Sequence, residues 1–327
     1  MQKLRTMTTA AFMLSVGSTA LAGSFDGNWV ALIPPQGQCS RTSIMTLTLS
    51  GNTFQGQTRY PSSTEAFSGK IDAEGNGTFL VYPRFPGIIK FAGDHFDANW
   101  NNEVCSLHAL GDRALTSVET SAAFSARKRM QSDYAHLTKR ATEGDKSVDF
   151  STLRAAYPYT DQWDPFGNKT AALLDQAAAA AKGKDCATAL VKLEEILKLD
   201  FTIDTAHALR SDCLAATGNA GESKIESEIA DSLIRSLMNS GNGNSEATAY
   251  VIVTQREEMD VLANRQLLLK VRQTEVRGED GRFYDEVQAT STRSSERLET
   301  VYFDISSYVN GRKSRMAAIE TLASTMP

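Results

Sequence analysis

Apolar and polar residues alternate with a period of two along the first third of the chain. In SIMTLTLSGNTFQGQTRY, Met45, Leu47 and Leu49 fall on one face of a strand, and the intervening threonines fall on the other. Turn residues separate such runs at intervals of roughly 8–12 residues, which is typical of a closed or stacked antiparallel sheet. The pattern therefore predicts an all-β barrel or sandwich over residues 24–114. The further runs are FSGKIDAEGNGTFLVY, GIIKFAGDHFDANW and VCSLHAL.

The pattern changes after residue 114. Residues 115–125 are rich in Ser, Thr and Ala and are predicted to be a linker, and a polar helix is predicted to follow. In CATALVKLEEILKL and the neighbouring runs, apolar residues recur at helical spacing. Gly183 and Gly218 lie 35 residues apart, close to the ~34-residue tetratricopeptide period. Residues 126–327 are therefore expected to begin with helices that include a tetratricopeptide-like helical hairpin.

Strand patterns return towards the C-terminus. ATAYVIVTQ and ETVYFDIS are predicted strands, and LLLKVRQTEVRGEDGRFYDEVQAT is predicted to form two strands about a turn at residues 279–281. A final amphipathic helix is predicted over residues 313–323. Helices followed by strands indicate an α+β domain with antiparallel strands packed against helices.

The N-terminus has the pattern of a secretory signal peptide. Lys3 and Arg5 precede an apolar, small-residue run that ends in an A-x-A motif, which predicts removal of residues 1–22 by cleavage between Ala22 and Gly23. A buried or membrane-anchoring helix is the alternative, but a span requires about 20 strongly apolar residues. No later run approaches that length, so no transmembrane segment is expected after cleavage. We expect the protein in the periplasm or outside the cell.

Charge limits the range of partners. The chain carries a net charge of −5, and loss of residues 1–22, which hold two basic residues and no acid, changes the charge to −7. An acidic chain without a basic stretch has no electrostatic footprint for nucleic acid. A protein or another envelope component is the expected partner.

Four cysteines remain after cleavage, namely Cys39, Cys105, Cys186 and Cys213. Exported chains meet oxidising conditions, so an even number predicts disulfides, although four cysteines allow three connectivities. The domain division favours Cys39–Cys105 and Cys186–Cys213, and free buried thiols are the alternative. The chain has no C-x-x-C or H-x-x-x-H spacing, so neither a metal site nor a cofactor is expected.

The stretch DFSTLRAAYPYTDQWDPFG places Arg154 among Tyr157, Tyr159 and Trp163. An arginine held between aromatic rings can bind a carboxylate or phosphate through two hydrogen bonds. The structural interpretation is a clamp over the helices, in which Arg154 pairs internally with Glu257 or Glu258. Apolar residues at helical spacing before Pro158 favour the clamp.

Three other polar residues are candidates for binding or catalysis. His207 lies between two alanines of a predicted helix, and Glu257 and Glu258 lie where a strand leads into a helix. A buried histidine bonded to a neighbour, and acids placed at a helix N-terminus, explain these positions without a ligand.

Two resemblances cover most of the chain. DFSTLRAAYPYTDQWDP, AHALRSDC, SGNGNSEATAYVIVTQREEMDVL, FYDEV and VYFDIS resemble, in this order, the bacterial domain of unknown function 4919, over about residues 148–305. Gln162-Trp163 departs from the simpler Tyr-Asp-Pro run of that family. The resemblance implies a fold and export but no activity. FDGNWVALIPPQGQC, FSGKID and GTFLVY resemble a small β domain of exported alphaproteobacterial proteins.

These features leave three hypotheses for function. The first is a non-catalytic binding module at the cell envelope, which contacts a protein, peptidoglycan or another envelope component. The second is a hydrolase, which requires Arg154, His207, Glu257 and Glu258 to converge in one cleft. The third is a secreted effector. The first is favoured because no catalytic set of residues is evident in the sequence.

Overall fold

The computed structural model describes residues 25–33, 43–60, 63–81, 85–93, 95–101, 106–293 and 298–325. Contacts divide the chain into two compact units, Met1–Ala114 and Leu115–Pro327. The predicted leader with its cleavage point at Ala22 and Gly23, and the cysteines Cys39 and Cys105, lie outside the described residues.

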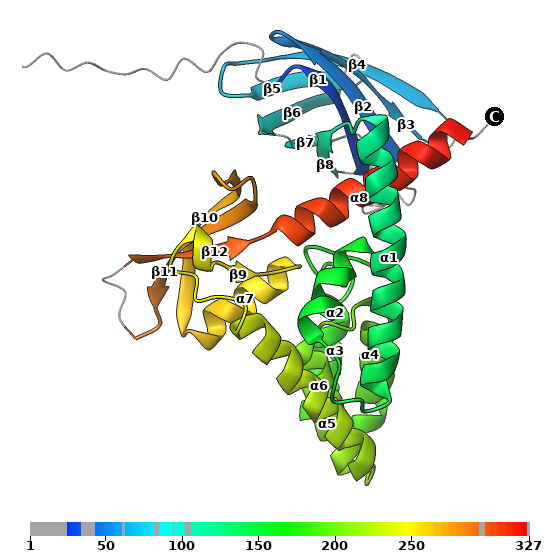
Figure 1. The fold of residues 1–327 in the computed structure, drawn as a ribbon, viewed down its shortest axis with the longest axis vertical. Helices are drawn as coiled ribbons and strands as arrows, with labels where there is room; N and C mark the ends of the chain where they lie inside the picture. The colour runs from blue at the N-terminus through cyan, green and yellow to red at the C-terminus, as the bar shows by residue number, and fades with distance from the viewer. Residues whose placement is uncertain are drawn as a thin grey trace, which may run out of the picture. The chain divides into compact units, whose positions relative to one another are not determined.

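The strands of the first unit form a closed antiparallel barrel (Figure 1). Each strand pairs with the next along the chain, and β1 closes the barrel by pairing with β8. The closed sheet confirms the predicted antiparallel β domain and shows that it is a barrel and not a sandwich. The strands are β1 (Gly27–Ile33), β2 (Ser43–Ser50), β3 (Thr53–Arg59), β4 (Thr64–Ile71), β5 (Asn76–Val81), β6 (Phe85–Ala92), β7 (His95–Asn101) and β8 (Ser106–Arg113).

Aromatic rings fill the interior of the barrel. Burial alternates along the strands, so that in β2 Met45, Leu47 and Leu49 point inward and the threonines between them are exposed. The inner rings meet at centroid separations between 5.0 Å, for Trp29 and Phe91, and 6.3 Å, mostly edge to face or tilted. This is the preferred geometry of aromatic pairs. The buried rings are Trp29, Phe54, Phe67, Phe79, Phe91, Phe96 and Trp100.

Glycines on neighbouring strands make room for four of these rings. The cross-strand pairs are Phe54 with Gly69, Phe67 with Gly56, Phe79 with Gly87 and Phe96 with Gly111. A Cβ at Gly69 would lie 2.4 Å from the Phe54 ring and 2.3 Å from the backbone oxygen of Thr78. Only a residue without a side chain allows such an approach, and a ring laid over a strand glycine replaces the packing that the glycine lacks.

The second unit begins with helix α1 (Ser117–Thr142). It starts inside the segment predicted as a linker, so the prediction of a linker over residues 115–125 is wrong. The cause is a capping box: Thr116 Oγ accepts from the Glu119 backbone N–H at 3.3 Å, and the Glu119 carboxylate accepts from the Thr116 N–H at 2.9 Å. This reciprocal cap allows a Ser- and Thr-rich stretch to enter a helix.

Helices continue along the chain after a short irregular segment. Helix α2 (Phe150–Ala156) is capped by the Asp149 carboxylate and is followed by a 3₁₀ turn, Tyr157–Tyr159. Four helices follow, and each packs against the next. The predicted helical layer is thus present, but a tetratricopeptide-like hairpin is not shown and stays a prediction. These helices are α3 (Ala171–Lys182), α4 (Cys186–Leu199), α5 (Asp204–Ala216) and α6 (Ala220–Met238).

The unit ends with a sheet of strand order β10-β11-β12-β9. Strands β10 (Leu267–Arg277), β11 (Phe283–Ser291) and β12 (Leu298–Asp304) pair antiparallel, as predicted. The short β9 (Tyr250–Val251) instead pairs parallel with β12, so the sheet is mixed and the prediction is wrong for this strand. Helix α7 (Gln255–Asn264) and the β10–β11 hairpin separate β9 from β12 along the chain, and no tight turn imposes antiparallel pairing on them.

Helix α8 (Ser306–Thr325) closes the chain and starts earlier than predicted. The Asp304 carboxylate accepts a hydrogen bond from the Ser306 N–H at 2.9 Å, so the helix starts directly after β12. Apolar residues of α6, α7 and α8 join the inner face of the sheet in one buried cluster. Its members include Leu237, Val261, Leu262, Val287, Val301, Phe303 and Val309.

Candidate functional site

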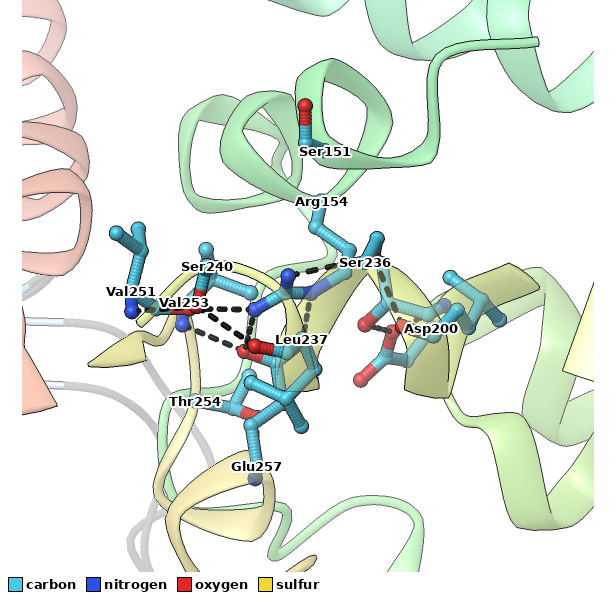
Figure 2. A network of polar contacts seen from close by, with 12 residues as sticks. Ser151, Arg154, Asp200, Ser236, Leu237, Ser240, Val251, Val253, Thr254 and Glu257 are labelled. Atoms are coloured by element: carbon cyan, nitrogen blue, oxygen red, sulfur yellow. Dashed lines mark hydrogen bonds and ion pairs between the residues drawn. The ribbon is translucent and has the colours of Figure 1, made fainter. Parts of the chain in front are cut away.

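A buried ion pair joins α2 and α7 in the second unit (Figure 2). Arg154 of α2 donates from Nε to Glu257 Oε1 at 2.6 Å and from Nη2 to Glu257 Oε2 at 2.9 Å. The exposed fractions of the two side chains are only 3% and 6%. Glu257 is one of the two internal partners that the sequence suggested for Arg154, and this two-point geometry is the strongest form of such a pair.

The remaining polar atoms around this pair also bond within the protein. Arg154 Nη2 donates to the carbonyl oxygen of Val251 at 2.6 Å, and Nη1 donates to Ser236 Oγ at 3.3 Å. Glu257 Oε2 also accepts the backbone N–H of Val253 at 2.8 Å. The pair therefore joins α2, α6, β9 with the segment that follows it, and α7. Four of the five guanidinium N–H groups of Arg154 thus donate to partners within the protein, and the side chain is 3% exposed.

The aromatic residues near Arg154 also contact other segments of the second unit. Tyr157 is fully buried, stacks on Tyr134 at 5.7 Å and donates from its hydroxyl to the Leu199 carbonyl at 3.3 Å. Trp163 donates from Nε1 to the Val253 carbonyl at 3.0 Å and packs edge to face on Tyr308. Tyr159 is half-buried, and burial raises its pKa above the ordinary value. Tyr157 and Trp163 thus have structural partners within the core.

His207 lies in a separate cluster. It is fully buried, with Nδ1 2.6 Å from Glu226 Oε2 and Nε2 2.9 Å from the carbonyl oxygen of Phe201. Arg210 lies 3.1 Å from the other oxygen of Glu226. Both ring nitrogens face internal partners, so neither is directed at an external group.

Glu258 points away from Glu257 and pairs with a different arginine. Arg272 donates from Nε and Nη2 to Glu258 Oε1 at 2.9 and 2.7 Å. Burial raises the pKa of Glu258, and the Arg272 charge opposes that shift. Among the residues that the structure describes, no group donates to Glu258 Oε2. The structure brings Arg154 and Glu257 together and gives His207 and Glu258 partners of their own.

A cluster of acidic side chains near Glu257 was not predicted from the sequence. Burial, with the nearby charge of Asp204 as the next cause, raises the pKa of Asp260 to about 7 against the opposing charge of Arg256. Burial raises the pKa of Asp200 to about 6, although hydrogen bonds from Thr202 lower it. Perturbed acids mark functional sites or buried networks alike. The i, i+4 spacing of Arg256 and Asp260 on α7 is visible in the sequence, but the acids of α4–α5 come from residues more than fifty positions earlier.

The cysteines of the second unit are free thiols. The predicted Cys186–Cys213 bond is therefore not present in the structure. The two lie in one apolar cluster, and burial, followed by a hydrogen bond with the Cys186 thiol, raises the pKa of Cys213 to about 12. Cys186 at the start of α4 and Cys213 near the end of α5 are thus neighbours in the fold.

In the part of the chain that the structure describes, no three His, Cys, Asp or Glu side chains are grouped in a way that could hold a metal ion. In the same residues, no helix combines the length and the apolar character that crossing a membrane requires.

Comparison with known proteins places the second unit in a family. No curated protein and no solved structure matches the chain. A family model for the domain of unknown function DUF4919 matches residues 126–314, which run from within α1 to within α8. The match is wider at both ends than the predicted 148–305, and it leaves the alphaproteobacterial likeness of the barrel as a prediction. Because the matched region is more than half of the chain, the protein belongs to the DUF4919 family.

Proposed function

We propose that this protein is an exported, non-catalytic binding protein of the cell envelope, located in the periplasm or outside the cell. The observation that carries the proposal is the internal pairing of the candidate residues in the family domain. Arg154 is bonded to Glu257, Glu258 to Arg272, and His207 to Glu226. Side chains that are buried and bonded in this way hold a scaffold together, whereas catalysis needs groups that reach a substrate.

Export is supported by the leader-like pattern of residues 1–22. In an oxidising compartment, we further propose that Cys186 and Cys213 join. Each thiol loses one proton and the pair gives up two electrons to an oxidised protein dithiol carrier, which is reduced. Cys186 is half-buried and Cys213 is buried, so the exchange starts at Cys186. The resulting bond would connect the start of α4 with the end of α5.

The hydrolase hypothesis has weaker support. Arg154 and Glu257 meet, but they are bonded to one another, and His207 and Glu258 are each bonded to a different residue. A hydrolase of this kind would have to break a buried ion pair before each turnover. Removal of one partner from a buried ion pair lowers the stability of a protein by about 3–5 kcal/mol, which indicates how unfavourable the separation is.

Sedimentation with isolated cell envelopes tests the proposed function. The full-length protein is expressed in a bacterium with its own leader, the exported form is purified, and its intact mass is measured. We expect loss of residues 1–22 and saturable sedimentation with envelopes that His207→Gln leaves unchanged. An uncleaved protein confined to the cytosol, or no sedimentation above that of an unrelated exported protein, would contradict the proposal.

A further inference from the structure

The outer wall of the barrel carries a groove of about 540 Å³ across β4, β5, β6 and β7. The groove is lined chiefly by paired bases, acids and amides, with one exposed aliphatic side chain among them. Its charged and amide residues are Lys70, Asp72, Asn76, Lys90, Asp97 and Asn99.

Strand register arranges the lining residues in two parallel rows. One row runs Lys70, Thr78, Ile88 and Asn99 across four neighbouring strands. The second row runs Asn76, Lys90 and Asp97. Opposite residues on one face of a sheet lie about 4.5–5.5 Å apart at Cβ, so the rows form a continuous polar surface.

Hydrogen bonds hold the polar side chains of this surface in place. Lys90 donates to Asn76 Oδ1 at 2.6 Å, and Asn76 Nδ2 donates to the two oxygens of Asp72 at 3.2 and 3.0 Å. On the other side of the groove, Asn99 Nδ2 donates to Asp97 Oδ1 at 2.6 Å, and Asp97 Oδ2 lies 3.0 Å from His108 Nε2. Side chains fixed by their neighbours lose less conformational entropy when a ligand binds.

Ile88 provides an apolar surface between the polar groups. Its side chain is 62% exposed and lies in the first row between Thr78 and Asn99. The groove therefore presents ammonium, amide and hydroxyl donors, carboxylate acceptors and one aliphatic contact within a single hollow.

This combination suits a ligand that is itself rich in hydroxyl groups. A sugar hydroxyl both donates and accepts, so it can bond to a carboxylate and an ammonium group at once, and the C–H face of a sugar ring can rest on Ile88. An extended peptide is disfavoured, because a closed barrel has no free strand edge at this wall. A nucleic acid is disfavoured because the two lysines are balanced by two acids.

We propose that this groove is a glycan-binding site. The proposal rests on the envelope function proposed above, since the envelope is the source of the glycan. It adds the class of ligand and the residues that contact it: Lys70, Lys90 and Asn99 bond to ring hydroxyls, and Ile88 contacts the ring face. Asp72 orients the side-chain amide of Asn76, and Asp97 orients that of Asn99.

Binding of the exported full-length protein to an array of purified neutral, N-acetylated and uronic-acid oligosaccharides tests this site. Lys90→Ala and Asn99→Ala each remove one contact, and Gln57→Ala on the exposed face of β3 is the matched control. We expect a loss of about tenfold in affinity for each groove variant, which corresponds to one hydrogen bond with a charged or strongly polar group. The control should bind as the wild type does, and thermal unfolding should show all three variants folded.

Two results would overturn the glycan site. One is wild-type protein that retains no oligosaccharide, and the other is groove variants that bind as tightly as Gln57→Ala. The envelope experiment separates this failure from failure of the proposed function. A Lys90→Ala/Asn99→Ala double variant that still sediments with envelopes shows that the envelope function holds at another surface, such as one that binds a protein. Wild-type protein that does not sediment rejects the envelope function itself.

Discussion

The two units achieve stability by different means. The barrel has an interior of apolar and mainly aromatic side chains, and its tightest contacts are between rings and glycines. The second unit encloses charged groups, of which the Arg154–Glu257 pair joins four segments. An aromatic core is sensitive to added volume, whereas a buried ion pair is sensitive to the loss of one partner. The difference shows that polar residues concentrated in one unit need not mark a site for chemistry.

Loss of one partner of the ion pair is expected to have the largest effect. Arg154→Met leaves the Glu257 carboxylate buried without its counter-charge, and should lower the free energy of unfolding of the second unit by about 3–5 kcal/mol. Urea unfolding followed by far-ultraviolet circular dichroism measures the change. Arg235→Met, at an exposed position on α6, is the control and should stay within about 0.5 kcal/mol of the wild type. If both substitutions lower the free energy of unfolding equally, the Arg154–Glu257 pair does not have the stabilising role assigned to it.

The cysteines offer a second way to sharpen the comparison. Oxidation of Cys186 and Cys213 should stabilise the second unit by about 2–4 kcal/mol, because the bond constrains the unfolded chain. Alkylation of the exported protein before and after reduction, read by intact mass, detects the bond. In a Cys186→Ser variant, added reductant should no longer shift the unfolding of this unit. Two freely alkylated thiols at these positions in exported protein would refute the bond.

The barrel should respond to added volume. Gly69→Ala places a methyl group 2.3 Å from the Thr78 backbone oxygen and against the Phe54 ring, so it should destabilise the barrel by about 1–3 kcal/mol. Near-ultraviolet circular dichroism, which reports on the packed rings, follows the transition. Gly221→Ala in α6, where nothing lies within 4 Å, should be neutral or slightly stabilising. A neutral Gly69→Ala would show that the barrel wall can yield at this position.

The smallest effect is expected at the acid cluster, and it depends on pH. Burial raises the folded-state pKa of Asp260 to about 7, above its ordinary value of 3.8, so the stability of the unit falls as pH rises between about 4 and 7. Asp260→Asn imitates the protonated acid and should stabilise the unit by about 1 kcal/mol at pH 8, after allowance for partial exposure. The gain should shrink towards pH 5. Asp175→Asn, exposed on α3, should show no such dependence, and a similar gain there would contradict the assignment.

The helices and strands were predicted correctly where the hydrophobic periodicity of the sequence is strong. The β2–β3 and β4–β5 hairpins and the helices from α3 to α6 lie where alternation or helical spacing placed them. The start of α1 was missed, because the Thr116–Glu119 capping box outweighs the low helical preference of the residues around it. The parallel β9 was missed because its partner lies some fifty residues away and no local pattern reports such a pairing.

The candidate site was only partly predictable for the same reason. Adjacent helical residues point about 100° apart, so Glu257 and Glu258 could not both face Arg154. The sequence suggested either glutamate, and the phase of α7 relative to α2 selects Glu257 and turns Glu258 towards Arg272. Partners of His207 and the cluster around Asp260 depend on the packing of α5 against α6 and α7. Tertiary packing of this kind is not encoded in residue spacing.

A double-mutant cycle on Arg154 and Glu257, combined with envelope sedimentation, tests the central claim that this pair is a structural element. We predict that Arg154→Met/Glu257→Met costs less than the two single substitutions together, by about 0.5–3 kcal/mol, and that the double variant still sediments with envelopes. A double variant that is folded and stable but no longer sediments, or that loses a measurable hydrolytic activity of the wild type, would contradict the claim.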